Sequence, residues 1–279
     1  MKRAIASDLP AITAFLMARK PRAMFPLSNL ARFGLDGRGD YAPSIWFAAE
    51  SGEVTDALVV GQGGAVMPVM PNGDWAAAKA VLTGRAVSAV IGPTEEVRPL
   101  IDVLGIGKAV TTLDDDEPHF SLHLDQLVIP EGPGEIAPLA TADPETMIAW
   151  RAAYCEESLG LDRDAATKDG RASYHRYIAA QSHRVLMDGD TPLATTGFNA
   201  ALPDIVQVGG VYTPPAFRRC GHARRIVALH LAEARATGAK TAVLFSGSEN
   251  AARAYRAIGF TQIGWWTLFL LREKVIVDG

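Results

Sequence analysis

The stretch Val211-Tyr-Thr-Pro-Pro-Ala-Phe-Arg-Arg-Cys-Gly-His-Ala223 joins a predicted strand to a predicted helix through a loop rich in proline and arginine. The strand, Ile205–Thr213, is rich in Val and Gly, and the two prolines end it because proline cannot donate to a strand ladder. The helix that follows carries apolar residues at helical spacing, and Gly238 suits its C-terminal cap. The pattern predicts an α/β arrangement in which a loop leads directly into a helix start.

The start of this helix is unusually basic. Cations near the positive end of the helix dipole destabilise a helix by about 0.3 kcal/mol or more each. Free backbone N–H groups at a helix start, with a glycine that allows close approach, bind phosphate. The sequence therefore predicts a site for more than one phosphate group, and the alternative is a surface helix with a basic face. The basic residues are Arg218, Arg219, Arg224 and Arg225.

This segment resembles motif A of the GNAT superfamily of acyl-CoA-dependent N-acyltransferases, which reads Gln/Arg-x-x-Gly-x-Gly/Ala after a strand. Arg218, Gly221 and Ala223 match its fixed positions. Downstream, Tyr255-Arg-Ala-Ile-Gly-Phe260 is similar to the closing Tyr-x-x-x-Gly-Phe of the family. The resemblance covers about residues 135–271 and implies a GNAT fold there.

The resemblance also implies acetyl-CoA as co-substrate, no metal, and roles for individual residues. Tyr255 and Asn250 are expected to lie near the thioester sulfur. Tyr255 suits the donor of a proton to the leaving thiolate, and the alternative is a core tyrosine that packs under the helix. The family often has Asn seven residues before the Tyr, where this chain has Ser248, so the role of Asn250 departs from the pattern. The pyrophosphate is expected on the backbone amides of Arg218, Arg219, Cys220, Gly221, His222 and Ala223, and the pantetheine on the strand edge at Val211, Tyr212 and Thr213.

The acceptor is expected to be an amine of a small molecule or peptide. Trp150, Tyr154 and Glu157 follow each other at spacings of four and three, so they share one helix face. In the family the first helix borders the acceptor, and aromatic rings beside a carboxylate favour a cationic amine. The alternative is that Trp150 and Tyr154 are core residues and Glu157 is solvated. No residue stands out as the general base.

Composition excludes several classes of protein. The chain of 279 residues has a net charge of −4, which does not favour a nucleic-acid binder. Cys155 and Cys220 do not make a disulfide framework, and Cys220 in the loop is not expected to be a nucleophile. The six histidines form no metal-binding pattern. No targeting or membrane segment is evident, so we expect a cytoplasmic protein with no membrane partner, and its oligomeric state stays open.

A weak internal repeat predicts two GNAT-like domains in tandem, at 1–130 and 131–279. Arg3-Ala-Ile-Ala-Ser-Asp-Leu-Pro10 and Ile136-Ala-Pro-Leu-Ala-Thr-Ala-Asp-Pro144 each precede a helical stretch, and each half continues with a hairpin. Glu131-Gly-Pro-Gly134 is the expected linker. The predicted fold class is α/β (α+β), with a mixed, mostly antiparallel central sheet flanked by helices in each domain.

The first half lacks the phosphate motif. Between Met67 and Trp75 it has no arginine, and Asp74 is expected to cap the next helix and repel an anion. We therefore expect an N-acetyltransferase whose C-terminal copy is catalytic by direct attack, and whose first half closes one wall of the substrate cleft or acts as a regulatory domain. The alternatives are a non-catalytic acyl-CoA-binding sensor and an aminoacyl-tRNA-dependent transferase of the tandem GNAT-fold type.

Overall fold

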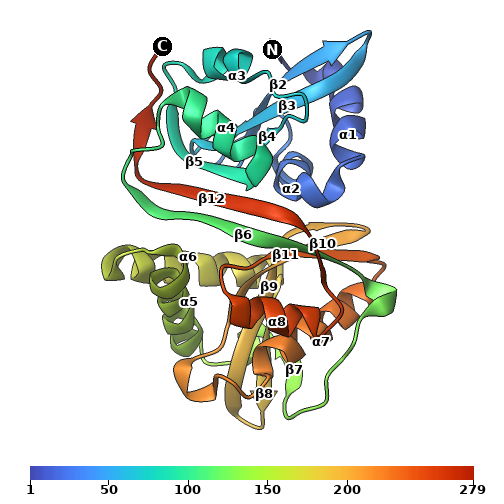
Figure 1. Cartoon of the computed structure of the whole chain (residues 1–279). Helices are drawn as coiled ribbons and strands as arrows, with labels where there is room; N and C mark the ends of the chain where they lie inside the picture. The colour runs from blue at the N-terminus through green and yellow to red at the C-terminus, as the bar shows by residue number, and fades with distance from the viewer. The chain divides into compact units, whose positions relative to one another are not determined.

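The computed structural model describes all residues, 1–279, and the chain forms two compact units. Unit 1 consists of Met1–Pro118 and Gly264–Gly279, so it holds both ends of the chain, and unit 2 consists of His119–Ile263 (Figure 1). The chain leaves unit 1 within strand β6 (Thr111–His123) and returns within strand β12 (Thr261–Ile276).

A six-stranded sheet forms the centre of unit 1, in the order β1-β2-β3-β4-β5-β12. Neighbouring strands are antiparallel except β4 and β5, which run parallel. The hairpin between β2 and β3 turns at Ser51-Gly52, where both residues have positive φ. The strands besides β12 are β1 (Lys2–Arg3), β2 (Pro43–Glu50), β3 (Glu53–Gly61), β4 (Ala65–Val69) and β5 (Ala86–Pro93).

Four helices accompany this sheet. Alternation along the strands places Leu58, Val66 and Val90 in one buried cluster with side chains of α3 and α4. Leu82, Leu100 and Phe269 belong to the same cluster, all of them almost fully buried. The helices are α1 (Leu9–Met17), α2 (Met24–Phe33), α3 (Trp75–Leu82) and α4 (Thr94–Leu104), with short 3-10 turns at Ala6–Asp8 and Lys20–Arg22.

Unit 2 repeats this sheet in the order β7-β8-β9-β10-β11-β6. The strands are again antiparallel except for one parallel pair, β10 and β11. The hairpin of β8 and β9 turns at Gly189-Asp190, so the hairpin predicted for this half is confirmed. The strands besides β6 are β7 (Glu135–Pro138), β8 (His183–Asp188), β9 (Thr191–Leu202), β10 (Ile205–Tyr212) and β11 (Thr241–Phe245).

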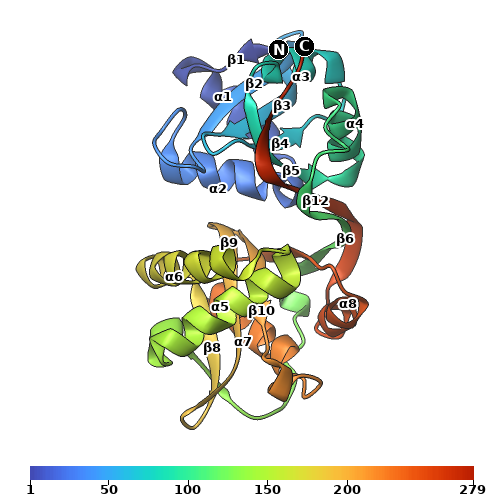
Figure 2. The same cartoon turned by 90° about the vertical axis from the view of Figure 1, so that its left-hand side faces the viewer.

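Helices cover both faces of the unit 2 sheet. Val206 and Val208 of β10 pack with Val227 and Leu231 of α7 in one cluster. On the opposite face, a second cluster joins β8 with α5 and α6, and Figure 2 shows these two helices in front of the strands. The helices are α5 (Pro144–Leu159), α6 (Arg163–Ala180), α7 (His222–Ala236) and α8 (Glu249–Arg256), with 3-10 turns at Leu124–Gln126, Leu139–Thr141 and Pro215–Phe217.

The two units share one topology, with the parallel pair in the same place, so the predicted tandem fold of two mostly antiparallel sheets flanked by helices is confirmed. Each sheet also takes a strand from the other half of the sequence. In unit 1, β5 pairs with residues 266–276 of β12, and in unit 2, β11 pairs with residues 119–123 of β6. Unit 1 is therefore built from two segments, whereas unit 2 is one continuous segment, and the predicted boundary at 130/131 stays a prediction about the repeat.

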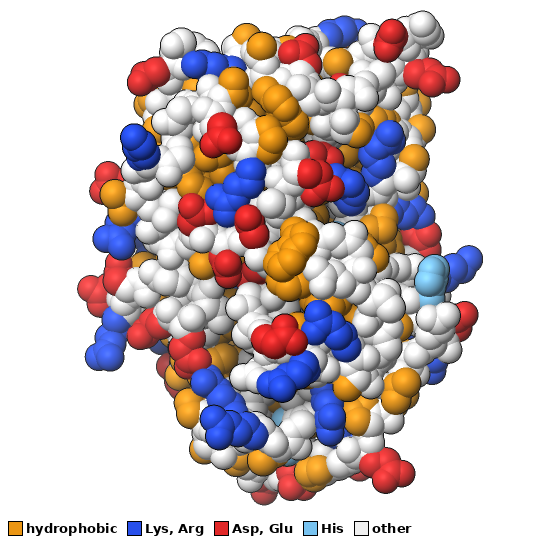
Figure 3. Space-filling view, viewed as in Figure 1, with side chains coloured by type: hydrophobic (Ala, Val, Ile, Leu, Met, Phe, Trp, Pro, Cys, Tyr) orange, Lys and Arg blue, Asp and Glu red, His pale blue; other side chains and the backbone are white.

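Charges are mixed on the surface. The chain has 27 Lys and Arg against 31 Asp and Glu, and on the face in Figure 3 the basic and acidic side chains are interspersed rather than gathered in one field of a single sign. Among the helices, none has both the length and the apolar composition that crossing a membrane requires.

Candidate functional site

Strands β10 and β11 diverge partway along unit 2. They pair only over residues 205–207 and 241–243. Beyond these residues β10 continues to Tyr212 with β9 as its partner, and β11 continues to Phe245 with β6 as its partner. The edge of β10 that faces β11 therefore lacks a strand partner after Gln207. Such an edge can receive an extended ligand through backbone hydrogen bonds.

A bulge lies at the open part of β10. The register against β9 shifts between Gly209 and Tyr212, and Gly210 has a φ of 61°, which favours glycine. A Cβ at Gly210 would come within 3.1 Å of Nε2 of His183, so the position is also short of space. The bulge changes the direction of the backbone immediately before the predicted residues Val211, Tyr212 and Thr213. The carbonyl of Thr213 already accepts a hydrogen bond from Nε of Arg218, at 2.9 Å.

The loop after β10 leaves a helix start without a cap. Gly221 is the N-cap of α7, with a φ of 86°, and it has no side chain to accept from the first turn. The amide of Arg218 closes the 3-10 turn on Pro215, and the next amide with an acceptor in the chain is that of Arg225. The amides of residues 219–224 are thus open, and they lie at the positive end of a helix dipole. This arrangement can bind a phosphate group.

The four arginines of this region have different partners. Arg218 forms an ion pair with Glu157, with 2.5 Å between Nη2 and Oε2. Arg225 donates to the carbonyls of Pro130, Pro133 and Gly134. It therefore binds the linker before β7 and does not contribute its guanidinium to the loop before α7. Arg219 and Arg224 make no ion pair, and Nε of Arg224 lies 3.2 Å from where a Cβ of Gly221 would stand. Two free cations therefore accompany the open amides.

Glu157, which we expect at the acceptor, contacts Tyr212 of β10 and Arg218 of the loop before α7. Its Oε1 accepts from the hydroxyl of Tyr212 at 3.0 Å, and its Oε2 pairs with Arg218. Burial and the neighbouring Glu157 raise the pKa of Tyr212, so its hydroxyl stays protonated. Trp150 lies against Tyr212, with ring centroids 6.1 Å apart. The helix face predicted from spacing thus exists, but its carboxylate is already bound within the chain.

Tyr255 and Asn250 lie on α8 in different surroundings. Tyr255 is 7% exposed and packs in the core with its ring 6.0 Å from that of Phe260. Asn250 is exposed in the first turn of α8, and its side-chain oxygen accepts from Arg253. Ser248, which stands where the family often has Asn, caps α8 by accepting from the amide of Ala251 at 3.2 Å. The assigned roles of Tyr255 and Asn250 stay predictions.

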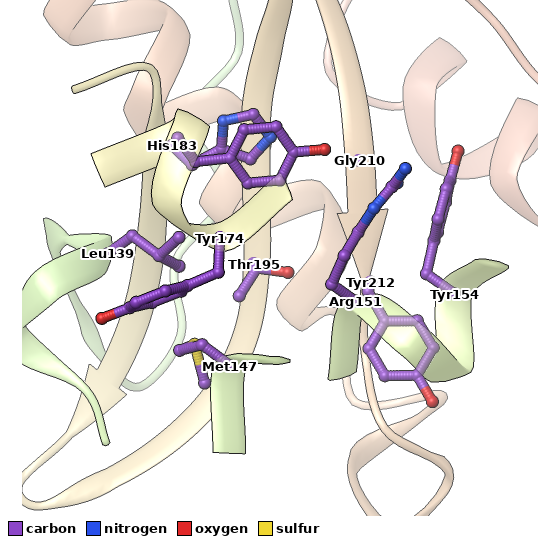
Figure 4. Close-up of a pocket in the computed structure, with 10 residues that line it drawn as sticks. Leu139, Met147, Arg151, Tyr154, Tyr174, His183, Thr195, Gly210 and Tyr212 are labelled. Carbon is purple, nitrogen blue, oxygen red and sulfur yellow. The ribbon is translucent and has the colours of Figure 1, made fainter. Parts of the chain in front are cut away.

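A pocket lies on the α5 and α6 side of the sheet, beside the bulge (Figure 4). Tyr154 and Arg151 extend next to each other from α5, and Gly210 and Tyr212 of β10 also line the pocket. Of the three residues expected at the acceptor, only Tyr154 lines this pocket. Its walls are mainly aromatic and aliphatic, and the remaining lining residues are Leu139, Met147, Tyr174, Tyr177, His183 and Thr195.

One buried ion pair borders the pocket. Arg151 donates from Nε and Nη2 to Oδ2 of Asp169, at 3.0 and 2.9 Å. The thiol of Cys155 donates to the same oxygen at 3.2 Å. Burial raises the pKa of this thiol to about 12, so Cys155 stays protonated and is not a nucleophile at neutral pH.

The sequence reading missed His183 and the glycine that makes room for it. The ring of His183 is stacked on Tyr177 with centroids 3.4 Å apart, and Nδ1 lies 2.9 Å from the hydroxyl of Ser182. A Cβ at Gly197 would lie only 2.2 Å from Nε2, so this ring requires glycine in the neighbouring strand. Burial lowers the pKa of His183 well below its ordinary value, so the ring is neutral. Alternation in β8 and β9 places His183 and Gly197 on one face, which was the available signal.

Solved structures with this fold span the whole chain. A GCN5-related N-acetyltransferase from Sphaerobacter thermophilus has a TM-score of 0.56 at 14% identity, with 100% of this chain and 95% of that chain covered. A tandem GNAT protein from the clavulanic acid biosynthesis pathway has a TM-score of 0.53 at 13% identity, with coverages of 100% and 98%. An acetyltransferase from the GNAT family of Colwellia psychrerythraea has a TM-score of 0.52 at 14% identity, with coverages of 97% and 99%. At these identities the likeness establishes the fold alone.

The sequence itself matches a family model. Among curated proteins no match was found. The model of the acetyltransferase (GNAT) family matches residues 145–260, which include β10, the loop with Gly221, and α7. Residues 145–260 therefore belong to the GNAT acetyltransferase family, and the chain is an acyltransferase enzyme with a tandem GNAT fold.

Proposed function

We propose that this enzyme transfers an acetyl group from acetyl-CoA to the amine of a small molecule or peptide by direct attack. The observation that carries the proposal is the open helix start at Gly221 next to the unpaired edge of β10. Pyrophosphate on the amides of residues 219–224 would direct the rest of the CoA molecule along this edge. Arg219 and Arg224 add the positive charge that a second phosphate group requires.

The acyl group would then lie at the bulge. A backbone N–H of the β10 edge, near Val211, would hydrogen-bond the thioester carbonyl and stabilise the negative charge that develops on its oxygen. The amine nitrogen attacks the carbonyl carbon, the C–S bond breaks, and the thiolate takes a proton. Tyr255 is our candidate donor of that proton, because it packs in one cluster with Val206 and Val208 of β10.

Direct attack is favoured over an acyl-cysteine intermediate. The thiol of Cys155 is protonated and bound to Asp169, and Cys220 lies in the phosphate loop, away from the bulge. The amine must lose its ammonium proton before attack, since the pKa of an alkylamine is about 10.4. We assign catalysis to 131–279, leave 1–130 without a CoA site, and propose a reducing, cytoplasmic setting for the two free cysteines.

The proposal is tested with the full chain, acetyl-CoA and a panel of amines. Free thiol should appear only when an amine is present, and mass spectrometry should find the acetylated amine. Binding of acetyl-CoA in calorimetry without thiol release from any amine would contradict transfer and favour a sensor. Acetyl-CoA that fails to bind at all, together with transfer from aminoacyl-tRNA, would favour the tRNA-dependent alternative.

A further inference from the structure

The pocket beside the bulge contains a guanidinium group that the transfer chemistry does not use. The side chain of Arg151 is 16% exposed, and its guanidinium lies 4.9 Å from the ring of Tyr154 and 5.9 Å from the ring of Tyr177. Figure 4 shows it extending beside Tyr154 in the pocket wall. A cation this deeply buried is costly unless it is paired or serves a ligand.

Asp169, the partner of Arg151 within the chain, does not accept from all of its guanidinium nitrogens. Asp169 accepts through Oδ2 alone, from Nε and Nη2 of Arg151, from Cys155 and from the hydroxyl of Ser173 at 2.9 Å. That hydroxyl in turn accepts from Nη2 of Arg176 at 2.8 Å. Asp169 therefore pairs directly with Arg151, Arg176 reaches it only through the hydroxyl of Ser173, and Nη1 of Arg151 has no acceptor within the chain.

Apart from Asp169, which pairs with Arg151, no acidic side chain is available at the pocket to bind a cationic substrate. No aspartate or glutamate lines the pocket. Glu157, the nearest acidic residue on the same helix face, uses one oxygen for Tyr212 and the other for Arg218. The neighbouring His183 is buried and neutral. The electrostatics of the pocket thus favour an anionic group on the acceptor and disfavour a second cationic group.

We propose that the acceptor is an aminocarboxylate, with its carboxylate on the guanidinium of Arg151 and its amine directed to the bulge at Gly210. This rests on the proposed function, because Gly210 belongs to the strand on which the thioester would lie. A guanidinium pairs with a carboxylate through parallel N–H donors, which fixes the orientation as well as the position of the ligand. The aromatic walls at Tyr154, Tyr174 and Tyr177 would enclose the carbon skeleton.

Arg151 in this proposal is a specificity-determining residue, and its test compares matched acceptors. Alanine and phenylalanine are each assayed beside their amides, alaninamide and phenylalaninamide, with acetyl-CoA and a free-thiol readout. The ratio of kcat/KM for acid over amide is expected to be at least about tenfold higher in the natural protein than in Arg151→Met, with the difference mainly in KM. Comparing ratios removes the effect of the different amine pKa values.

Two further variants keep the test interpretable. Arg151→Met leaves Asp169 without its partner, so Arg151→Met with Asp169→Asn is measured as well, and it should show the same loss of selectivity with unchanged affinity for acetyl-CoA. Arg184→Met is the matched control, because Arg184 pairs with Glu233 of α7 at 2.8 Å and does not line the pocket. Its acid-to-amide ratio should equal that of the natural protein.

The outcomes separate the two proposals. Transfer to amides with the same acid-to-amide ratio in the natural protein and in both Arg151 variants overturns the aminocarboxylate proposal and leaves acetyl transfer standing. A preference for amides or for decarboxylated amines in the natural protein overturns it as well. If none of these acids or amides releases thiol while another amine does, the aminocarboxylate proposal is overturned and acetyl transfer stands. If acetyl-CoA binds and no amine at all releases thiol, the proposed function itself fails, and the acceptor proposal with it.

Discussion

The starts of helices α3 and α7 occupy the same place in the two units and differ in how their amides are satisfied. In unit 1, Asp74 caps α3 by accepting from the amide of Ala77 at 3.1 Å, as its sequence position predicted. In unit 2, Gly221 caps α7 with no side chain, and six amides stay open. The same topology thus gives a helix start that is capped by a side chain in unit 1 and a helix start with open amides in unit 2.

The strand before each helix shows the same difference. In unit 1 the amide of Met70, just after β4, donates to Oε2 of Glu96 at 2.7 Å. The other oxygen of Glu96 pairs with Arg22 at 2.6 Å, and burial raises the pKa of this carboxyl. In unit 2 the corresponding part of β10 has no such side chain on its free edge. A side chain of unit 1 therefore fills a hydrogen-bond position that stays open in unit 2.

The last helices of the two units, α4 and α8, differ at one position that matters for the proposed chemistry. Aligning Gly105 with Gly259, both in positive φ after the helix, places Ile101 opposite Tyr255. Ile101 is buried in the apolar core of unit 1, where it can only pack. Tyr255 is equally buried but adds a hydroxyl, which is the group that our proposal uses as a proton donor.

The largest expected effect tests the helix starts. Gly221→Asp should weaken acetyl-CoA binding about a thousandfold, because the carboxylate would cap the amides and repel the pyrophosphate. Gly221→Asn has nearly the same shape and also tolerates positive φ, so its weaker loss separates charge from bulk. Calorimetry on folded variants measures both affinities. Equal affinity for the Asp variant and the natural protein would remove the loop from the CoA site.

Tyr255→Phe should lower kcat about fiftyfold with little change in the affinity for acetyl-CoA, because the ring stays in the core while the donor is lost. Ile101→Val is the matched core change in unit 1, and we expect it to leave kcat unaltered. The readout is single-turnover thiol release. A natural rate for Tyr255→Phe, with chemistry rate-limiting, would make Tyr255 a packing residue like Ile101.

One buried group in each unit should change the free energy of unfolding as the pH falls, and the two changes should have opposite signs. Burial lowers the pKa of His230 in unit 2 to about 3, so its contribution to stability is complete above the unfolded value near 6.5 and declines as pH falls. Burial raises the pKa of Glu117 in unit 1 to about 7, so its contribution is complete below about 4.5 and is lost as pH rises through 7.

Urea unfolding of His230→Phe and Glu117→Gln at about pH 5 and pH 7.5 checks this difference. Relative to its variant, the natural protein should lose about 2 kcal/mol at His230 on going to the lower pH, and gain about 2 kcal/mol at Glu117. The phenylalanine keeps the ring stack with Phe198, whose centroid lies 3.8 Å from that of His230. Free-energy differences that do not change with pH would contradict the two shifts.

The smallest effect concerns the cap of unit 1. Asp74→Ala should lower the free energy of unfolding by about 1 kcal/mol, because the amide of Ala77 loses its acceptor. Acetyl-CoA affinity should stay unchanged, since the helix start of unit 1 lacks arginines. Thermal unfolding and calorimetry measure the two quantities. A gain of CoA binding in Asp74→Ala would show that the Asp74 cap alone prevents unit 1 from binding CoA.

The sequence predicted the elements of the site closely because their signals are local. Alternation and the two prolines located β10 within one residue, and helical spacing with Gly221 located α7. The turn of the β8–β9 hairpin and the loop at 131–134 followed from Gly, Asp and Pro, whose backbone preferences act over a few residues. The cap of α3 by Asp74 is local in the same way.

Partners across long sequence separations were decided by the tertiary structure. Spacing placed Glu157 on the same helix face as Trp150 and Tyr154. It could not reveal that Arg218, 61 residues later, forms an ion pair with this carboxylate. The basic count at α7 likewise could not show that Arg225 fastens the linker, or that Arg151 and Asp169 meet beside a pocket. The pairing of β6 with β11 and of β12 with β5 also joins segments that are far apart in the sequence. Local backbone preferences determine where elements begin and end, whereas charge pairing and strand neighbours depend on which distant segments the folded core brings together.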